Sequence, residues 1–280
     1  MLKIISNDVH NGTRHNIYKF VIIFAFTIMA CMMLRYQAEL KSRYGAAYSV
    51  QPGIVDYVIN MFGGMKSFTV SESSRFEVPL PWMTIQLLIS SCVFSYVSDN
   101  MRCNGRLLLM LSGTRKGWWA GKYIWAVSQV IIAYLCILAG CIVAALAAGT
   151  FNNADGGLLH RDIIYAVAGV RIINEDSIAA GVVLSNLIYP FVCNIAIVLV
   201  QMTLQLFINP IASLAVVIAY NISSLFITSP FLICNMAMLY RNANITASGI
   251  APSLCVIPAI AGTALVCAAG IYEFKRKDIL

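Results

Sequence analysis

Long stretches without a charged residue constrain the fold of this chain more than any other feature of its sequence. Asp, Glu, Lys and Arg are absent from residues 20–34, 78–98, 123–154, 177–240 and 242–272. A helix needs about 20 apolar residues, at about 1.5 Å each, to cross the hydrocarbon core of a bilayer. Only 11% of the 280 residues are charged, against about 25% in soluble domains. The sequence therefore predicts an all-α, polytopic membrane protein.

Six membrane-spanning helices fit these uncharged stretches, in one transmembrane domain that covers residues 1–280. The longest stretch holds two spans, and Asn209 with Pro210 is its natural break because Pro suits the first turn of a helix. Lys19 and Arg35, near the ends of the first span, can extend their charged groups to the two membrane surfaces. The predicted spans are residues 18–36, 82–100, 119–148, 182–207, 211–230 and 253–273.

Lys and Arg residues predict the orientation of the spans, because positive charge gathers in cytoplasmic loops. With the N-terminus inside, the cytoplasmic segments carry the whole formal net charge of +7 and the outside loops are neutral. The expected outside loops are residues 37–81, 151–181 and 234–252. Both termini are therefore predicted to be cytoplasmic. The positive charge then meets anionic membrane lipids, and a nucleic-acid partner is not expected.

Residues 100–116, between the second and third predicted spans, form the most distinctive segment of the sequence. The apolar run at 107–111 (LLLML) is too short to span and is flanked by basic residues, which is typical of a short amphipathic helix on the membrane surface. Gly113 would end such a helix, and Trp118 with Trp119 would anchor the next span at the headgroups. The alternative is a solvated turn that carries ordinary cytoplasmic charge.

Patterns typical of catalysis or metal binding are absent from the sequence. The nine Cys residues include no CxxC pair and lie mostly within predicted spans, which favours apolar packing over a disulfide framework or a zinc site. His10, His15 and His160 have no partners at metal-ligand spacing. Residues 117–123 lack the spacing and the Ser or Thr of a phosphate-binding loop. We therefore expect no catalytic residue, no metal site and no cofactor on this chain.

Apart from Asp99 and Glu273, which lie at the ends of two predicted spans, the spans contain amides and hydroxyls but no acidic residue. Proton- or sodium-coupled carriers usually need a carboxylate within the membrane, so a secondary carrier is disfavoured. Asn194, Gln201 and Gln205 are spaced by seven and four residues, which places them on one face of the fourth span. They could form a polar translocation seam at a dimer interface. The interpretation we favour is hydrogen bonding between helices.

Short motifs distributed along the chain carry a resemblance to a known family. They are residues 76–82 (FEVPLPW), Asp99 with Gly105, and residues 112–116, 118–122, 235–241 and 274–280. In their order and in the predicted topology, they resemble the membrane subunits of ABC type-2 exporters. The resemblance is closer to small six-helix permease-like proteins of Gram-positive bacteria.

The resemblance implies a permease of ABC type-2 exporter type in a bacterial plasma membrane. It would pair with a second permease subunit, identical or different, and with an ABC ATP-binding subunit that holds ATP and Mg²⁺. Residues 100–116 would couple the two kinds of subunit, with contacts at Arg102, Arg106, Leu108, Leu109, Arg115 and Lys116. The cargo would be a hydrophobic or amphipathic compound such as an antimicrobial peptide, a drug or a lipid. The alternative function is a non-transporting scaffold or sensor that recognises a ligand with its external loops.

Overall fold

The computed structural model describes residues 2–43, 51–66, 78–94, 96–99, 115–151, 158–160, 163–164, 169, 177–246 and 249–276. Its helices, in chain order, are α1 (Leu2–Arg43), α2 (Ile54–Phe62), α3 (Leu80–Cys92), α5 (Arg115–Ala148), α7 (Ala180–Asn186), α8 (Ile188–Leu204), α9 (Pro210–Phe226), η2 (Ile233–Asn235), η3 (Leu239–Arg241) and α10 (Pro252–Arg276). The strands β1 (Leu158–His160) and β2 (Ser177–Ala179) pair antiparallel and are an exception to the all-α prediction.

Several helices have the length and composition of membrane spans. Among the residues that the structure describes, five helical stretches qualify, namely Val9–Arg43, Leu80–Asp99, Arg115–Ala148, Ala180–Leu204 and Pro252–Phe274. The sixth apolar helix, α9, has 17 residues and is shorter than these. The long apolar helices indicate a membrane-embedded protein, as the uncharged stretches of the sequence predict.

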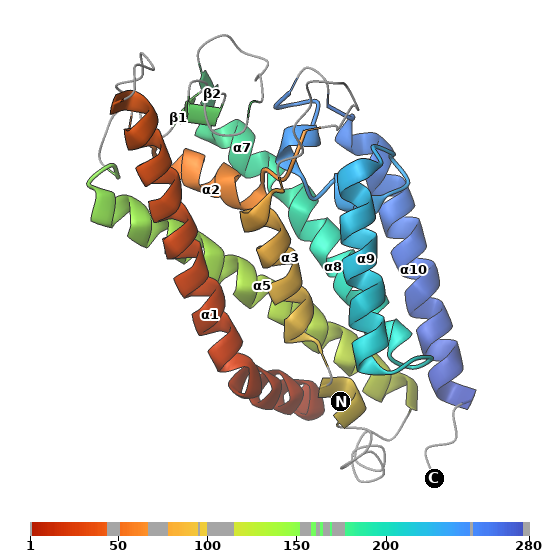
Figure 1. Ribbon diagram of the computed structural model, residues 1–280. Helices are drawn as coiled ribbons and strands as arrows, with labels where there is room; N and C mark the ends of the chain where they lie inside the picture. Colours follow the sequence, from red (N-terminus) through yellow and green to blue (C-terminus); the bar gives the residue numbers. More distant parts are fainter. Residues whose placement is uncertain are drawn as a thin grey trace.

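The helices run in alternating directions along an elongated bundle (Figure 1). We call the end that holds both termini, the end of α3 and the start of α5 the terminal end. The opposite end, which holds α2, α7 and the β1–β2 pair, is the distal end. The end of α3 and the start of α5 therefore lie on the same side of the bundle as the start of α1 and the end of α10.

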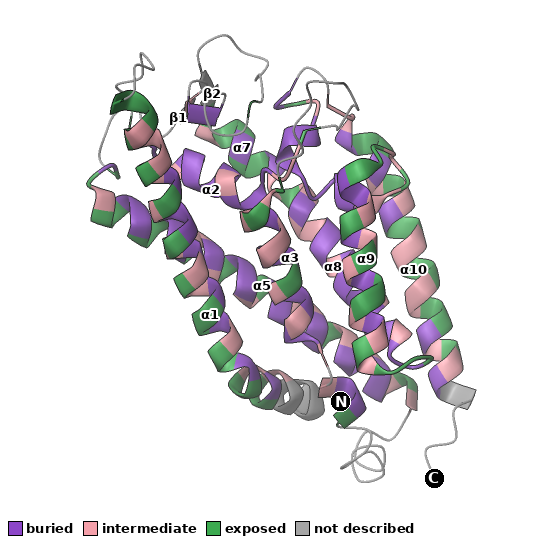
Figure 2. Ribbon diagram, in the orientation of Figure 1, coloured by how far each residue is buried: buried purple, intermediate pink, exposed green. Residues whose placement is uncertain are grey.

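Helix α8 lies at the centre of the bundle and α10 at its edge. α8 contacts α3, α5, α9 and α10, and 56% of the most apolar stretch of α7 and α8 is buried, against 17% for α10. Figure 2 shows buried residues on the inner faces of the helices and exposed residues on their outer faces. Ile257 and Leu265 of α10 are more than 70% exposed. Large apolar side chains on the outer surface suit a lipid surrounding.

The helix boundaries differ from the predicted spans in both directions: α1, α5 and α10 extend beyond them, whereas α3, α8 and α9 end earlier. α1 continues beyond the predicted 18–36 in both directions, and α5 begins at Arg115 rather than at residue 119. α9 begins at the expected break: Asn209 caps it by accepting the Ala212 N–H at 2.7 Å, and Pro210 is its first residue. The fourth predicted span is interrupted at Leu187, between α7 and α8.

Two of the expected outside loops contribute buried elements to the bundle. In the loop 37–81, α2 contacts α1, α3 and α5, and all but two of its nine residues are buried. In the loop 234–252, every residue of η3 is buried. The physical reason for α2 is that apolar residues surround most of its circumference, so a helix lying in solvent would expose several of them. The distal end is therefore a packed structure in the part of the chain that the structure describes.

Candidate functional site

Helix α3 ends inside a stretch that is long enough to cross the membrane. It stops at Cys92, the chain turns at Val93 and Phe94, and helical geometry returns at residues 96–99. We call the turn at Val93 and Phe94 the α3 break. The last carbonyls of a helix lack their usual N–H partners four residues on; at this break Ser91 O accepts the Phe94 N–H at 3.2 Å, and the other carbonyls need further donors where they are buried. The α3 break therefore needs hydrogen-bond donors from elsewhere in the protein.

Side chains from α1, from α8 and from Gln205, the residue directly after α8, supply these donors, one for each of four consecutive carbonyls. The pairs, donor first, are Gln201 Nε2 with Ser90 O (3.1 Å), Lys19 Nζ with Ser91 O (2.6 Å), Asn16 Nδ2 with Cys92 O (2.7 Å) and Gln205 Nε2 with Val93 O (3.2 Å). Because these donors come from two helices, the cap fixes the end of α3 between α1 and α8. We call this arrangement the α3 cap.

The α3 cap is also joined to α5. Asn16 Nδ2 donates a second hydrogen bond to Gln129 Oε1 at 3.0 Å, and Gln129 Nε2 donates to Thr13 Oγ1 at 3.2 Å. Asn16 and Gln129 are both buried, so these bonds form in a medium where an unpaired polar group is costly. The Lys19 ammonium adds charge attraction, since the C-terminal end of a helix carries partial negative charge. Four helices thus meet at one polar junction.

The structure separates the three residues of the predicted seam. Asn194 donates to Tyr134 Oη at 2.8 Å and to Pro190 O at 3.0 Å, so it joins α8 to α5. Gln201 and Gln205 belong to the α3 cap. All three side chains are buried and their donors are used within one chain, and among the described residues the amide oxygens of Gln201 and Gln205 have no hydrogen-bond partner. In this arrangement the three amides connect helices.

The predicted coupling residues are only partly within the described structure. Arg115 and Lys116 are the first two residues of α5, where Lys116 is exposed and Arg115 half-buried. Arg102, Arg106, Leu108 and Leu109 lie outside the described residues, as does Gly113.

The tryptophans expected to face the lipid headgroups point into the bundle instead. Trp118 and Trp119 of α5 are 2% and 0% exposed, and Trp82 of α3 is also buried, with its indole N–H donating to Ala237 O at 3.1 Å. Their large apolar area is used in contacts between helices. The nearby Lys122 is buried as well, and its ammonium lies 5.0 Å from the ring centroids of Tyr96 and Trp118, a cation–π arrangement.

A buried carboxylate and an imidazole meet at the distal end, which the sequence did not indicate. Asp56, in the first turn of α2, is 1% exposed. Its Oδ1 accepts the backbone N–H of His160 at 2.9 Å, and its Oδ2 lies 2.7 Å from His160 Nδ1 and accepts the Gly53 N–H at 2.8 Å. The pair fixes β1 to the start of α2. The only local signal was the spacing of Gly53 and Asp56, which is that of a helix capping residue and its partner.

Arg241 is a buried cation that binds carbonyl groups. It is 3% exposed and donates to Met65 O at 3.0 Å, to Leu225 O at 2.7 Å and to Ser224 O, and also to Asn235 Oδ1. It thereby caps the end of α9 and holds the segment that follows α2. Burial lowers the pKa of Arg241 to about 10.

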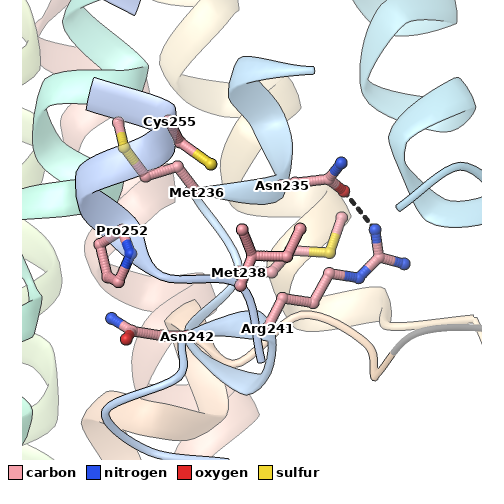
Figure 3. A pocket seen from close by; sticks show the side chains of 8 residues that line it. Asn235, Met236, Met238, Arg241, Asn242, Pro252 and Cys255 are labelled. Atoms are coloured by element: carbon pink, nitrogen blue, oxygen red, sulfur yellow. Dashed lines mark hydrogen bonds between the residues drawn. The ribbon is translucent and has the colours of Figure 1, made fainter. Parts of the chain in front are cut away.

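A pocket lies beside Arg241, and Figure 3 shows the arginine reaching Asn235 next to it. The lining residues are Asn235, Met236, Met238, Arg241, Asn242, Ile250, Pro252 and Cys255. Because the guanidinium donors are occupied by protein carbonyls, the pocket wall is largely apolar and sulfur-rich. Its residues do not bring together a nucleophile and a base, so the α3 cap remains the stronger candidate for a functional element.

Comparison with known proteins assigns the family. A family model with the description "Protein of unknown function (DUF2705)" matches residues 23–280. The chain belongs to the DUF2705 family. The match contains the α3 break and the capping residues Gln201 and Gln205, whereas Asn16 and Lys19 precede it. No curated protein and no solved structure matches the chain.

Proposed function

We propose that this chain is the permease subunit of an ATP-binding-cassette exporter, and that a separate subunit hydrolyses the ATP. Its cargo is a hydrophobic or amphipathic compound such as an antimicrobial peptide, a drug or a lipid. The observation that carries the proposal is the α3 cap, directly before the basic segment 100–116. A helix that is interrupted within the bundle and held by side chains of its neighbours is suited to act as a hinge.

The α3 cap gives segment 100–116 a mechanical connection to several helices at once. Because this segment is continuous with both helices in the sequence, its displacement would move α3 near the α3 break and α5 at Arg115. A movement of the end of α3 is also transmitted to α1 and α8, because Asn16 and Gln201 bind its carbonyls directly. A partner that moves segment 100–116 can therefore shift the packing of four helices, which is what coupling to ATP hydrolysis requires.

The proposed topology counts α9 as a sixth span. Its 17 residues extend about 25 Å, which is at the short end of the range for membrane spans. α9 packs against α3 and α8 and runs opposite to both (Figure 1). With six spans, the positive-inside rule places both termini and segment 100–116 in the cytoplasm of a bacterial cell, where ATP is available. A second permease subunit would complete the transporter.

The alternative function, a non-transporting scaffold or sensor, is favoured by one observation at the distal end. The Asp56–His160 pair and Arg241 fix the outer segments to the bundle, so a ligand bound there would act on an ordered surface. This function predicts ligand binding without an ATP-binding subunit.

Affinity purification of the tagged chain from its native host tests the proposal. In mild detergent, we expect one ABC ATP-binding subunit to co-purify and to be identified by mass spectrometry. A variant with Arg102, Arg106, Arg115 and Lys116 changed to Glu should lose it. The control variant, Lys41→Glu with Arg43→Glu, changes exposed basic residues at the distal end of α1 and should retain it. Absence of any ATP-binding subunit from the wild-type sample, while another ABC complex of the same membranes stays intact, would overturn the proposal.

A further inference from the structure

The exposed face of α1 changes from polar to apolar along the helix. Its exposed residues recur at helical spacing, so they form one continuous face, which we call the outer face. The polar part of this face consists of His10, Asn11, Arg14 and His15. Large side chains that are at least 59% exposed form the apolar part, namely Ile17, Val21, Met29 and Met33. One face with two compositions indicates that its surroundings change near residue 16.

Packing against α5 fixes the direction of the outer face. Gly12 lies directly against the Trp125 ring, where a Cβ atom would collide with the indole nitrogen. One turn later, Asn16 donates its hydrogen bond to Gln129 of α5. Phe20 continues the same inner face and is 5% exposed. Because this side of α1 is held against α5, the outer face is turned away from the bundle.

Two exposed tyrosines mark the ends of the apolar part. Tyr18 is 53% exposed and Tyr36 is 62% exposed. On a helix, the 18 positions between them correspond to about 27 Å, close to the thickness of a hydrocarbon core. Tyrosine is enriched where a membrane meets water. The two tyrosines therefore indicate the two membrane surfaces, and Arg14 lies at headgroup level on the side of the terminal end.

Arg14 is a cation that the protein leaves available. Among the residues that the structure describes, its guanidinium has no ion pair and no hydrogen bond. The described side chains from Val9 to Lys19 include no carboxylate. Arg35, at the other end of the apolar part, instead binds Glu39 Oε1 at 3.0 Å. An arginine without a carboxylate partner suits a phosphate group, which accepts two parallel N–H bonds from a guanidinium.

The neighbours of Arg14 on the outer face favour a phospholipid over a protein partner. His10 precedes Arg14 by one turn and is exposed, so its imidazole can bind the same phosphate. On the opposite side of Arg14, Ile17 and Val21 begin the apolar part. A phospholipid whose acyl chains cover these two residues places its phosphate beside Arg14. A single lipid molecule therefore matches both the charge and the apolar surface.

We propose that Arg14, together with His10 and His15, binds the headgroup of an anionic phospholipid in the leaflet at the terminal end. The inference does not depend on the proposed function. It adds a role for the start of α1, because Asn16 and Lys19 of the α3 cap follow Arg14 within two turns. A bound lipid would fix the part of α1 that holds the α3 break. One basic residue near an anionic membrane surface strengthens binding roughly fivefold.

Native mass spectrometry of the full chain in nonionic detergent tests the site. The added probes are phosphatidylglycerol and phosphatidylcholine with identical acyl chains, and the readout is the ratio of the two lipids in the complex with one lipid bound. We expect the wild type to prefer phosphatidylglycerol, and Arg14→Gln to reduce this ratio roughly fivefold. Arg14→Lys keeps the charge and should retain more of the preference. The matched control is Arg35→Gln, which also removes one charge but affects a guanidinium that Glu39 already binds, so the ratio should stay within about twofold.

Three outcomes would overturn the inference. In the first, Arg14→Gln retains the wild-type preference for phosphatidylglycerol. In the second, Arg35→Gln loses as much of the preference as Arg14→Gln, which would show that the lipid responds to net charge alone. In the third, Arg14→Gln keeps the lipid preference but loses a protein that co-purifies with the wild type from native membranes, so that the surface binds a protein. None of these outcomes depends on the capture of an ATP-binding subunit, so the site and the proposed function can fail separately.

Discussion

Replacing Asn16 with Leu removes the donor that connects the α3 break to α1 and α5. The substitution keeps the side-chain size and leaves Cys92 O and Gln129 Oε1 without the amide that now binds both. Hydrogen bonds between membrane helices contribute about 0.6 kcal/mol on average, and a buried acceptor left unpaired costs about 1–3 kcal/mol. The Asn16 Oδ1 atom has no partner among the described residues, so its removal offsets part of the loss. We expect a net destabilisation of about 1.5 kcal/mol.

Equilibrium unfolding in mixed detergent micelles, followed by the fluorescence of the buried tryptophans, measures this loss. The matched control is Asn60→Leu, because Asn60 is half-buried and makes one long hydrogen bond, 3.4 Å to Ala30 O. The control should lose less than about 0.5 kcal/mol. A double-mutant cycle of Asn16→Leu with Gln129→Leu should show coupling between the two sites. If Asn16→Leu is no more destabilising than the control, the carbonyls of the α3 break are not held by side chains, and the hinge argument fails.

Two further predictions concern the distal end and the orientation. Arg241→Lys should reduce the free energy of unfolding by about 3 kcal/mol, because one ammonium cannot reach the carbonyls of α9 and Met65 O together; a loss below about 1 kcal/mol would contradict this. On intact cells, a membrane-impermeant maleimide should label a Lys41→Cys chain and leave a Lys116→Cys chain unlabelled until the membrane is opened. The reverse labelling would show that the terminal end faces outward.

The helices could be predicted because their signals are local. Uncharged stretches of sufficient length mark the long apolar helices, and Pro210 marks the start of α9. The end of α3 had no such signal, since residues 90–99 contain neither Pro nor Gly. α3 ends there because donors from other helices stabilise its carbonyls, and those donors are distant in sequence.

The candidate site was only partly visible in the sequence. Gln201 and Gln205 could be placed on one face of a span by their spacing, but their acceptors are backbone carbonyls that any residue carries. The spacing also grouped Asn194 with them, although its partner lies on α5. Asp56 and His160 are more than 100 residues apart and each is an isolated residue in an expected loop. No sequence pattern therefore predicted that these two residues would pair.

The sequence by itself determined that this chain enters a membrane as a set of apolar helices, because hydrophobicity acts along short stretches and needs no partner. The tertiary structure decided where polar groups within that apolar surrounding find their partners. Trp118 and Trp119 illustrate the difference: as residue types they suit a headgroup anchor, yet in the structure their rings stack on Phe274. The physical reason is that a buried ring or amide is stabilised by whichever group the packing of helices brings to it, and packing depends on the whole chain.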